Sequence, residues 1–246
     1  MLSGPPVTGD VAAETLLELF LAGSPRQRRS LLSQLERRTA ELLPLIPAAL
    51  ERLDPSGDDW AGGTLVQQLQ AHGDESIRLD FLRRFPNGWL ACPSAAGLEY
   101  GSLQRYLMEQ EFEQADRLTS QRLRELAGED AVRRGYVYYS EVPAMASTDL
   151  ESLDRLWLVY SRGRFGFSVQ GRLLAACGGR WEKLWGRLGW KQDGIWTRYP
   201  ASFTWSLDAP DGHMPLVNQL RGVRLMDALL QHPALARRIA PAPAPA

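Results

Sequence analysis

The 246-residue sequence contains few of the residues that bind metals or form disulfides, with only 2 cysteines and 3 histidines. Cys92 and Cys177 lie far apart and form no Cys-x-x-Cys pair, so two small buried thiols are expected rather than a disulfide. His72, His213 and His232 do not pair with a cysteine or with one another at the spacing of metal ligands. The sequence therefore predicts no metal site built by protein side chains.

Excess charge and long apolar runs are also absent. The formal net charge is -1, so no overall field attracts the chain to nucleic acid, and any recognition of anions must be local. No apolar run approaches the ~20 residues of a membrane-spanning helix. The first 20 residues contain acidic residues but no Lys or Arg, which argues against a targeting peptide. A cytoplasmic protein without a nucleic-acid partner is expected.

Motifs of enzymes are missing as well. There is no Gly-x-Ser-x-Gly elbow, and Cys177 has no obvious base to activate it. The segment Gly163–Gly166 lacks the third glycine of a dinucleotide loop and the Lys-Ser/Thr of a phosphate loop. Its glycines are expected to form a turn that packs Phe165 and Phe167 inward. We predict no enzymatic activity and no catalytic residue.

Several carboxylates follow Tyr100 along one predicted helix. They lie among basic residues, so a solvated helix face is the expected environment. These carboxylates are Glu111, Asp116 and Glu125.

The hydrophobic pattern predicts an all-α fold that begins with an N-terminal helical bundle over residues 1–90. Apolar residues recur at helical spacing in several segments, and Pro44 and Pro47 should interrupt the longest of them. The predicted helices are Val11–Ala22, the interrupted stretch Arg26–Leu53, Thr64–Ala71 and Ser76–Phe85. The segment Pro86–Gly97, with two prolines and two glycines, is the candidate linker.

A second all-α domain with long ordered loops is predicted over residues 97–234. One helix should end at Gly128, and another should begin with Asp149 as its N-cap. A third should carry Trp181, Leu184, Trp185 and Leu188. The stretch Gly189–Asp211 is expected to be a long ordered loop with short strand-like pieces, followed by a last helix from about Pro215 to Gln231. Residues 235–246, rich in Pro and Ala, are expected to form a disordered tail.

Aromatic residues are unusually dense in this second domain. Six of the 8 tryptophans fall between Trp157 and Trp205. Helical spacing predicts that Trp157, Trp181 and Trp185 belong to the core. By contrast, the four large rings between Trp196 and Trp205 surround Pro200 and indicate a loop that could line an apolar ligand pocket.

Two arginines supply matching polar groups. Arg221 and Arg224 are spaced i, i+3 on one face of the predicted last helix, and Gly222 beside them allows a bulky group to approach. Arginine binds carboxylates through two parallel hydrogen bonds. A planar apolar ligand with carboxylate arms fits this pattern, and so does a pair of surface arginines bridged to nearby carboxylates.

Four segments of the second domain resemble the signature of the genomes-uncoupled family, whose members are porphyrin-binding activators of magnesium chelatase. The segments are Leu156–Gln170, Leu188–Lys191, Phe203–Pro215 and Asn218–Arg224. Their order and spacing are similar to those of the family from about Tyr100 to His232. The N-terminal helices look like the extra helical domain of cyanobacterial members.

The resemblance implies an all-α core whose two long loops form an open hydrophobic cavity for protoporphyrin IX or Mg-protoporphyrin IX. It implies that Arg221 and Arg224 meet the propionates. Phe203, Tyr199 and Trp205 would line one wall, and Tyr139 the other. Relatives commonly carry Trp at position 199 and Phe at position 139, and some carry a basic residue where this chain has Ser120.

The same resemblance implies a regulator without an intrinsic cofactor. It would stimulate magnesium chelatase through the large porphyrin-binding subunit of that enzyme, as a monomer, and peripheral association with membranes is compatible with this role. Two alternatives stay open: a bilin-binding family member in phycobilin metabolism, and a ligand-free helical scaffold. No residue obviously supplies an axial magnesium ligand; His213 is a candidate, and packing within the loop is its other expected role.

Overall fold

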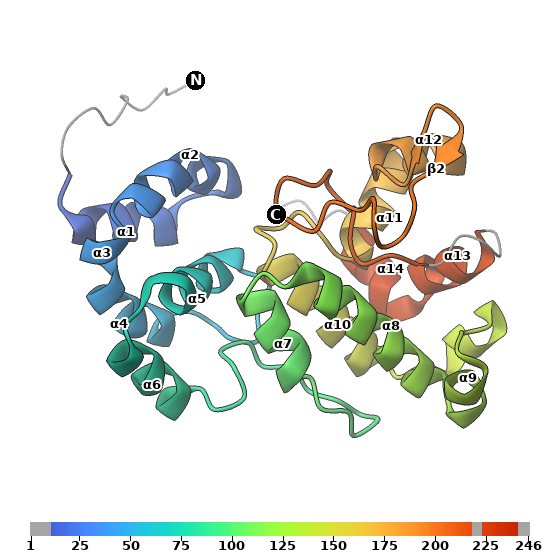
Figure 1. Ribbon diagram of the computed structural model, residues 1–246, viewed down its shortest axis with the longest axis horizontal. Helices are drawn as coiled ribbons and strands as arrows, with labels where there is room; N and C mark the ends of the chain where they lie inside the picture. The colour runs from blue at the N-terminus through green and yellow to red at the C-terminus, as the bar shows by residue number, and fades with distance from the viewer. Residues whose placement is uncertain (1–10, 218–222, 241–246) are drawn as a thin grey trace, which may run out of the picture.

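The computed structural model describes residues 11–217 and 223–240, and the regular structure of these residues is almost entirely helical (Figure 1). The N-terminal part consists of α1 (Ala13–Ala22), α2 (Pro25–Arg37), α3 (Thr39–Leu42), the 3-10 helix η1 (Leu43–Leu45), α4 (Ile46–Glu51), α5 (Trp60–His72) and α6 (Glu75–Arg84). The following part contains α7 (Gly101–Met108), α8 (Phe112–Ala127), α9 (Glu129–Arg134), the 3-10 helix η2 (Tyr139–Ala144), α10 (Ser147–Val159), α11 (Phe167–Ala176), α12 (Trp181–Arg187), β1 (Lys191–Gln192), β2 (Ile195–Trp196), α13 (Arg224–Gln231) and α14 (Pro233–Ile239). The predicted all-α class is confirmed.

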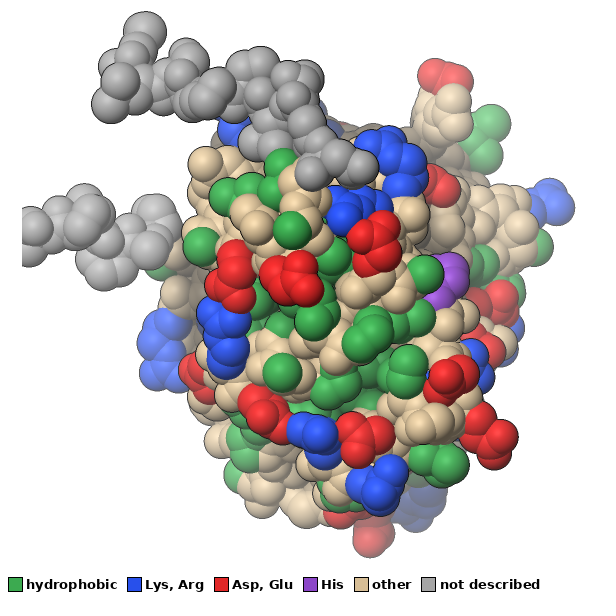
Figure 2. Space-filling view, turned by 90° about the vertical axis from the view of Figure 1, so that its left-hand side faces the viewer, with side chains coloured by type: hydrophobic (Ala, Val, Ile, Leu, Met, Phe, Trp, Pro, Cys, Tyr) green, Lys and Arg blue, Asp and Glu red, His purple; other side chains and the backbone are tan. Residues whose placement is uncertain are grey.

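The N-terminal helices follow the predicted pattern closely. Ser24 and Gln27 form a capping box at the start of α2, and Pro25 occupies its first turn, where a missing N–H costs nothing. Pro44 lies in η1 and Pro47 in the first turn of α4, so the two prolines divide the long apolar stretch as expected. Figure 2 shows the outer face of these helices, where apolar side chains surface between charged ones.

The predicted linker 86–97 contains neither helix nor strand, but it is packed against both parts of the molecule. Trp89 is buried, donates a hydrogen bond from Nε1 to the Leu50 carbonyl (3.3 Å), and lies so close to Gly62 that an added Cβ would be 2.2 Å from its ring. Gln67 of α5 donates to a carbonyl of α7 and to the carbonyl of the residue after α10. The buried core is therefore continuous across the segment, and the division into two domains stays a prediction.

Asp149 has a different role from the predicted N-cap. Helix α10 begins at Ser147, and Asp149 is fully buried within its first turn. Its carboxylate accepts hydrogen bonds from the amides of Ala95 (2.9 Å) and Ala96 (3.2 Å) and from the Tyr100 hydroxyl (2.8 Å). The N-cap prediction is wrong because this carboxylate holds the preceding segment instead of the amides of its own helix.

The last predicted helix starts later than expected. Residues 215–217 are not helical, and α13 begins at Arg224. The backbone here bonds to side chains: Gln170 donates to the carbonyls of Gly212 (2.9 Å) and Pro215 (2.8 Å), and the Leu216 amide donates to Asp116 (2.6 Å). The predicted start at Pro215 is therefore wrong.

The C-terminal tail is ordered further than the sequence indicated. Residues 233–239 form helix α14, whose Leu235 is buried against α10 and α11. The prediction of disorder from residue 235 is wrong for this helix because its apolar face completes the core. Residues 241–246 lie outside the described part of the chain.

The core predictions for the aromatic residues hold. Trp157 and Trp185 are buried, and Trp181 is partly buried with its ring stacked on Trp185 at 5.3 Å. Gly163 and Gly166 adopt φ values of 75° and 123° in the predicted turn, and the phenylalanines beside Gly166 are fully buried.

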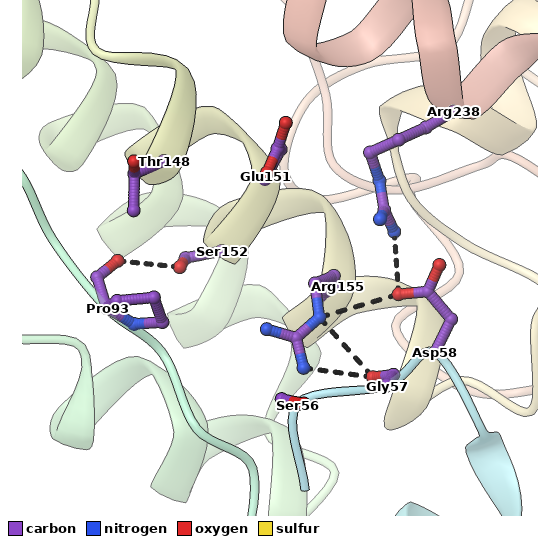
Figure 3. A pocket seen from close by; sticks show the side chains of 9 residues that line it. All are labelled: Ser56, Gly57, Asp58, Pro93, Thr148, Glu151, Ser152, Arg155 and Arg238. Atoms are coloured by element: carbon purple, nitrogen blue, oxygen red, sulfur yellow. Dashed lines mark hydrogen bonds and ion pairs between the residues drawn. The ribbon is translucent and has the colours of Figure 1, made fainter. Parts of the chain in front are cut away.

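Two arginines join the N-terminal part to the C-terminal helices at a polar pocket of about 290 Å³ (Figure 3). The guanidinium of Arg155 donates to the carbonyls of Pro55 (3.1 Å), Gly57 (2.9 Å) and Ala91 (2.9 Å). At the same pocket, Arg238 of α14 donates to Asp58 from Nη2 (3.0 Å) and to Asp154 from Nε (2.7 Å). The donors of Arg155 are occupied by the backbone and by Asp58, whose Oδ1 lies 3.4 Å from Nε, so this side chain is a structural clamp.

Replacing Arg155 by Ala should lower the free energy of unfolding by roughly 3 kcal/mol, because three carbonyls lose a charged donor. Urea denaturation measures the change. Arg237→Ala is the matched control, since its ion pair with Glu151 is largely exposed and should contribute less than about 1 kcal/mol. Equal losses in the two variants would contradict the clamp.

Candidate functional site

Three aromatic side chains of the loop after β2 form one cluster, called here the aromatic wall (Tyr199, Phe203 and Trp205). Phe203 and Trp205 stack with ring centroids 5.4 Å apart, and Tyr199 meets them edge-on at 5.5 and 5.8 Å. Phe203 is buried, whereas Tyr199 is 41% exposed. The fourth ring of this stretch, Trp196, packs on Trp185 instead and does not join the wall.

The wall keeps its shape because the loop satisfies its own polar groups. Trp205 donates from Nε1 to the Pro200 carbonyl (3.1 Å), and Thr197 donates to the Gly189 carbonyl (2.9 Å). Arg164 donates to the Ala209 carbonyl (2.9 Å) from outside the loop. The predicted ordered loop with strand-like pieces is confirmed, since β1 and β2 form its only regular structure within the described residues.

His213 lies behind the wall. Its Nδ1 donates to the Leu188 carbonyl (2.6 Å), its Nε2 accepts from the Thr204 amide (3.3 Å), and its ring is 4.7 Å from that of Phe203. Burial lowers its pKa, which favours the neutral imidazole that these two bonds require. Both nitrogens are engaged, so His213 packs the loop.

A second feature is an open groove between η2 and α13, with a volume of about 660 Å³, within the range of small-molecule sites. It is lined by Tyr139, Ser140 and Pro143 on one side and by Arg224, Asp227, Ala228, Gln231, His232 and Pro233 on the other. The structure therefore brings Tyr139 and Arg224, predicted from distant parts of the sequence, to one place.

Arg224 is the first residue of α13 and is exposed. Its guanidinium carbon lies 5.4 Å from the centroid of the Tyr139 ring, a cation–π contact that leaves the N–H groups accessible. No carboxylate of the described residues forms an ion pair with it. For Arg224, this differs from the alternative prediction of a surface arginine bridged to nearby carboxylates. Arg221 lies outside the described residues.

Helix α8 lies beside both features, and Asp116 is the residue that ties the loop to it. Asp116 is 1% exposed, so its predicted place on a solvated helix face is wrong. Its Oδ1 accepts from the Leu216 amide, its Oδ2 is buried without a hydrogen-bond partner in the described structure, and the Tyr199 hydroxyl lies close enough to affect its titration. Burial raises the pKa of Asp116 to about 7, against the lowering effects of Leu216 and Tyr199.

Sequence reasoning missed part of the groove lining. Asp227 and Gln231 share the helix face of Arg224 at i+3 and i+7, and the Gln231 amide donates to Asp227 at 2.9 Å. This spacing was a usable signal. His232 caps α14 by accepting from the Ala234 amide (3.3 Å), which no local pattern indicated.

Other kinds of site are not found in the regions that the structure describes. They contain no cluster of three or more His, Cys, Asp or Glu residues placed to hold a metal ion. They also contain no helix long and apolar enough to cross a bilayer.

Fold and site together define an all-α protein whose long loop carries an aromatic wall and whose last helices form an arginine-bearing groove. The family model described as GUN4-like matches residues 93–233, which is more than half of the chain, and the chain belongs to this family.

Similar proteins support this assignment. The Ycf53-like protein of Synechocystis sp. is 45% identical over 173 residues, which cover 70% of this chain and 74% of that protein. The chloroplastic tetrapyrrole-binding protein of Arabidopsis thaliana is 37% identical over 143 residues, 54% of each chain. The structure of GUN4 from Chlamydomonas reinhardtii matches with a TM-score of 0.57 at 37% identity, covering 60% of this chain and 94% of that one. The ligand-free structure of Arabidopsis thaliana GUN4 matches with a TM-score of 0.53 at 37% identity, over 56% and 99% of the two chains.

Asp116 should make stability depend on pH. A buried carboxyl whose pKa is raised from 3.8 to about 7 favours the folded state in its neutral form, and this stability is lost as pH rises through about 7. The free energy of unfolding of Asp116→Asn, taken relative to that of the wild type, should therefore rise by up to about 4 kcal/mol from pH 4 to pH 8. Each tenfold change in proton affinity corresponds to about 1.4 kcal/mol. Urea denaturation at the two pH values measures this gain.

The groups that face Asp116 are Tyr199 and the Leu216 amide from the loop, and Glu113 and Arg117 from its own helix. Asp130→Asn is the control, because Asp130 is exposed on α9. If Asp116→Asn and the wild type differ in free energy of unfolding by the same amount at both pH values, the raised pKa of Asp116 is contradicted.

Proposed function

We propose that this protein is a non-catalytic tetrapyrrole-binding protein whose ligand lies in the groove between η2 and α13 and extends to the aromatic wall. The observation that carries the proposal is the exposed Arg224, whose guanidinium lies over the Tyr139 ring where both residues line a groove of about 660 Å³. Membership of the GUN4-like family and the name of the Arabidopsis relative support the same ligand class.

The chemistry of the groove suits a flat apolar ring with acidic arms. Tyr139 and Pro143 offer apolar surface to the ring, and Arg224 offers a fork of N–H donors to a propionate. Arg221 is proposed as the second propionate partner from its sequence motif. Tyr199, Phe203 and Trp205 are proposed to cover the ring from the loop side.

The magnitudes agree with a carrier that also releases its ligand. Burying ~500 Å² of macrocycle at ~25 cal/mol/Å² contributes roughly 12 kcal/mol. Association and ordering of the loop offset ~4 to 10 kcal/mol of this. The remainder, with the arginine bonds, corresponds to roughly micromolar affinity or somewhat better.

The proposed ligands are protoporphyrin IX and Mg-protoporphyrin IX. The metal of the second ligand belongs to the porphyrin, and the protein need not hold it. His213 is not proposed as a ligand of that magnesium, because its Nδ1 donates to Leu188 and its Nε2 accepts from Thr204. Water is proposed in its place.

The proposed biological role is activation of magnesium chelatase in chlorophyll biosynthesis, through the large porphyrin-binding subunit. It rests on the family resemblance. The protein is proposed to act as a cytoplasmic monomer, without a cofactor of its own, and to associate peripherally with membranes.

Titration with protoporphyrin IX, followed by the Soret band and by tryptophan fluorescence, tests the proposal. The wild type should shift the band and lose fluorescence, and Arg224→Ala should raise Kd by roughly tenfold, the value of about one charged hydrogen-bond pair. Arg221→Ala should behave similarly. Competition with biliverdin distinguishes the bilin-binding alternative.

Arg105→Ala is the matched control. Arg105 is also exposed and also lies over a tyrosine ring, that of Tyr106 at 4.8 Å, but it lies on α7 away from the groove. The affinity of Arg105→Ala for protoporphyrin IX should equal that of the wild type. A wild type that produces no Soret shift would refute tetrapyrrole binding, and an unchanged affinity in Arg224→Ala would refute the role of Arg224 alone.

A further inference from the structure

One part of the molecule has a composition unlike the rest. Residues 180–198, called here the hairpin lobe, comprise α12 and the hairpin β1–β2. Figure 1 shows the lobe at the edge of the molecule away from the N-terminal helices. It contains five basic and two acidic residues, a net charge of +3, so the other residues together carry -4 of the chain total of -1.

Most of the positive side chains of the lobe are exposed and free of ion pairs with the residues that the structure describes, so they can bind an anionic surface. Four basic side chains of the lobe are exposed and form no ion pair with any carboxylate in the described ranges. They are Arg180, Lys183, Arg187 and Arg198. The fifth, Lys191, pairs with Glu182 at 2.7 Å. An anionic surface could therefore meet four cations without breaking an existing ion pair.

The tip of the lobe is apolar. Asp193 and Gly194 have φ values of 50° and 82°, so the hairpin closes with a two-residue turn of the kind that positive φ permits. The turn leaves Ile195 74% exposed and Trp196 40% exposed. Trp196 is supported from behind by Trp185 at 5.8 Å and by the Lys191 ammonium at 5.3 Å from its ring.

We propose that the hairpin lobe docks on a membrane surface that contains anionic lipids. Ile195 and Trp196 would enter the headgroup region, where tryptophan rings favour the boundary between apolar and polar layers. The four unpaired cations would face the anionic headgroups, each contributing a gain on the order of fivefold in affinity.

A lipid surface fits the geometry better than a protein surface. The apolar area is the narrow tip of a lobe that carries four exposed cations, whereas a protein interface buries about 800 Å² on each partner around an apolar centre. The inference rests on the peripheral membrane association proposed above and names the surface responsible. Because the tip and the aromatic wall belong to one loop, docking would bring the wall close to the bilayer, where apolar tetrapyrroles dissolve.

The test is sedimentation of the full chain, without tetrapyrrole, with vesicles of phosphatidylcholine alone or with phosphatidylglycerol as about a third of the lipid. The wild type should bind the anionic vesicles at least tenfold more tightly. Ile195→Glu should lose at least tenfold in affinity for them. Lys183→Gln combined with Arg187→Gln should lose on the order of tenfold or more, and this loss should shrink at high salt.

The matched control is Arg26→Gln combined with Arg29→Gln, which removes the same charge from exposed positions of α2 without an apolar tip. This control should bind as the wild type does. The proposal is overturned if the wild type binds neither vesicle, if Ile195→Glu binds normally, or if the α2 variant loses as much as the lobe variant. Binding to an acidic protein but to neither vesicle would overturn it as well.

The same variants separate this inference from tetrapyrrole binding. Ile195 is exposed and does not line the groove, so Ile195→Glu should keep the helical circular dichroism and the porphyrin affinity of the wild type. A loss of vesicle binding with porphyrin binding retained supports the lobe specifically. A loss of porphyrin binding in this variant would count against an independent role for the tip.

Discussion

A long loop can form a binding surface only if its backbone polar groups find partners, and this constraint shapes the second half of the molecule. Residues 189–217 contain only two paired strands of two residues each as regular structure, so most of their N–H and C=O groups need partners elsewhere. Side chains from the surrounding helices and turns supply them: Asp116 from α8, Gln170 from α11 and Arg164 from the turn before α11. These buried polar contacts hold the loop, and with it the aromatic wall, in place.

Hydrogen bonds from buried side chains to the backbone also join the two parts of the chain. Arg155 bonds to backbone carbonyls before α5 and after α6, and Asp149 bonds to the amides of the segment before α7. Such bonds fix orientation, because a buried charged group tolerates little displacement from its partners. The N-terminal helices and the groove are therefore held in one frame, although the groove takes its residues only from the second part.

Much of the fold followed from local signals in the sequence. Helical periodicity, the interruptions at Pro44 and Pro47 and the turn at Gly163 and Gly166 are local, and each appears where it was predicted. The errors came from side chains that act over long sequence distances. Asp116 and Asp149 look like ordinary surface or capping residues, and only the folded chain shows that each reaches a backbone amide at least 50 residues away.

The candidate site shows the same division. Tyr199, Phe203 and Trp205 were predictable as a group because they are neighbours in the sequence. The meeting of Tyr139 with Arg224 came from the family resemblance, since no spacing rule links positions 85 residues apart. Asp227 and Gln231 could have been found from the helical period of Arg224, whereas His232 depends on how α14 begins.

The hairpin lobe has one further property with practical weight. Lys183 and Lys191 are the only lysines of the chain, and both belong to the lobe. Every lysine that an amine-directed reagent can modify therefore lies in this lobe. A molecule coupled to a sensor chip or bead through a lysine is held by the lobe, so a partner that uses the lobe is hindered from binding to it on such a support.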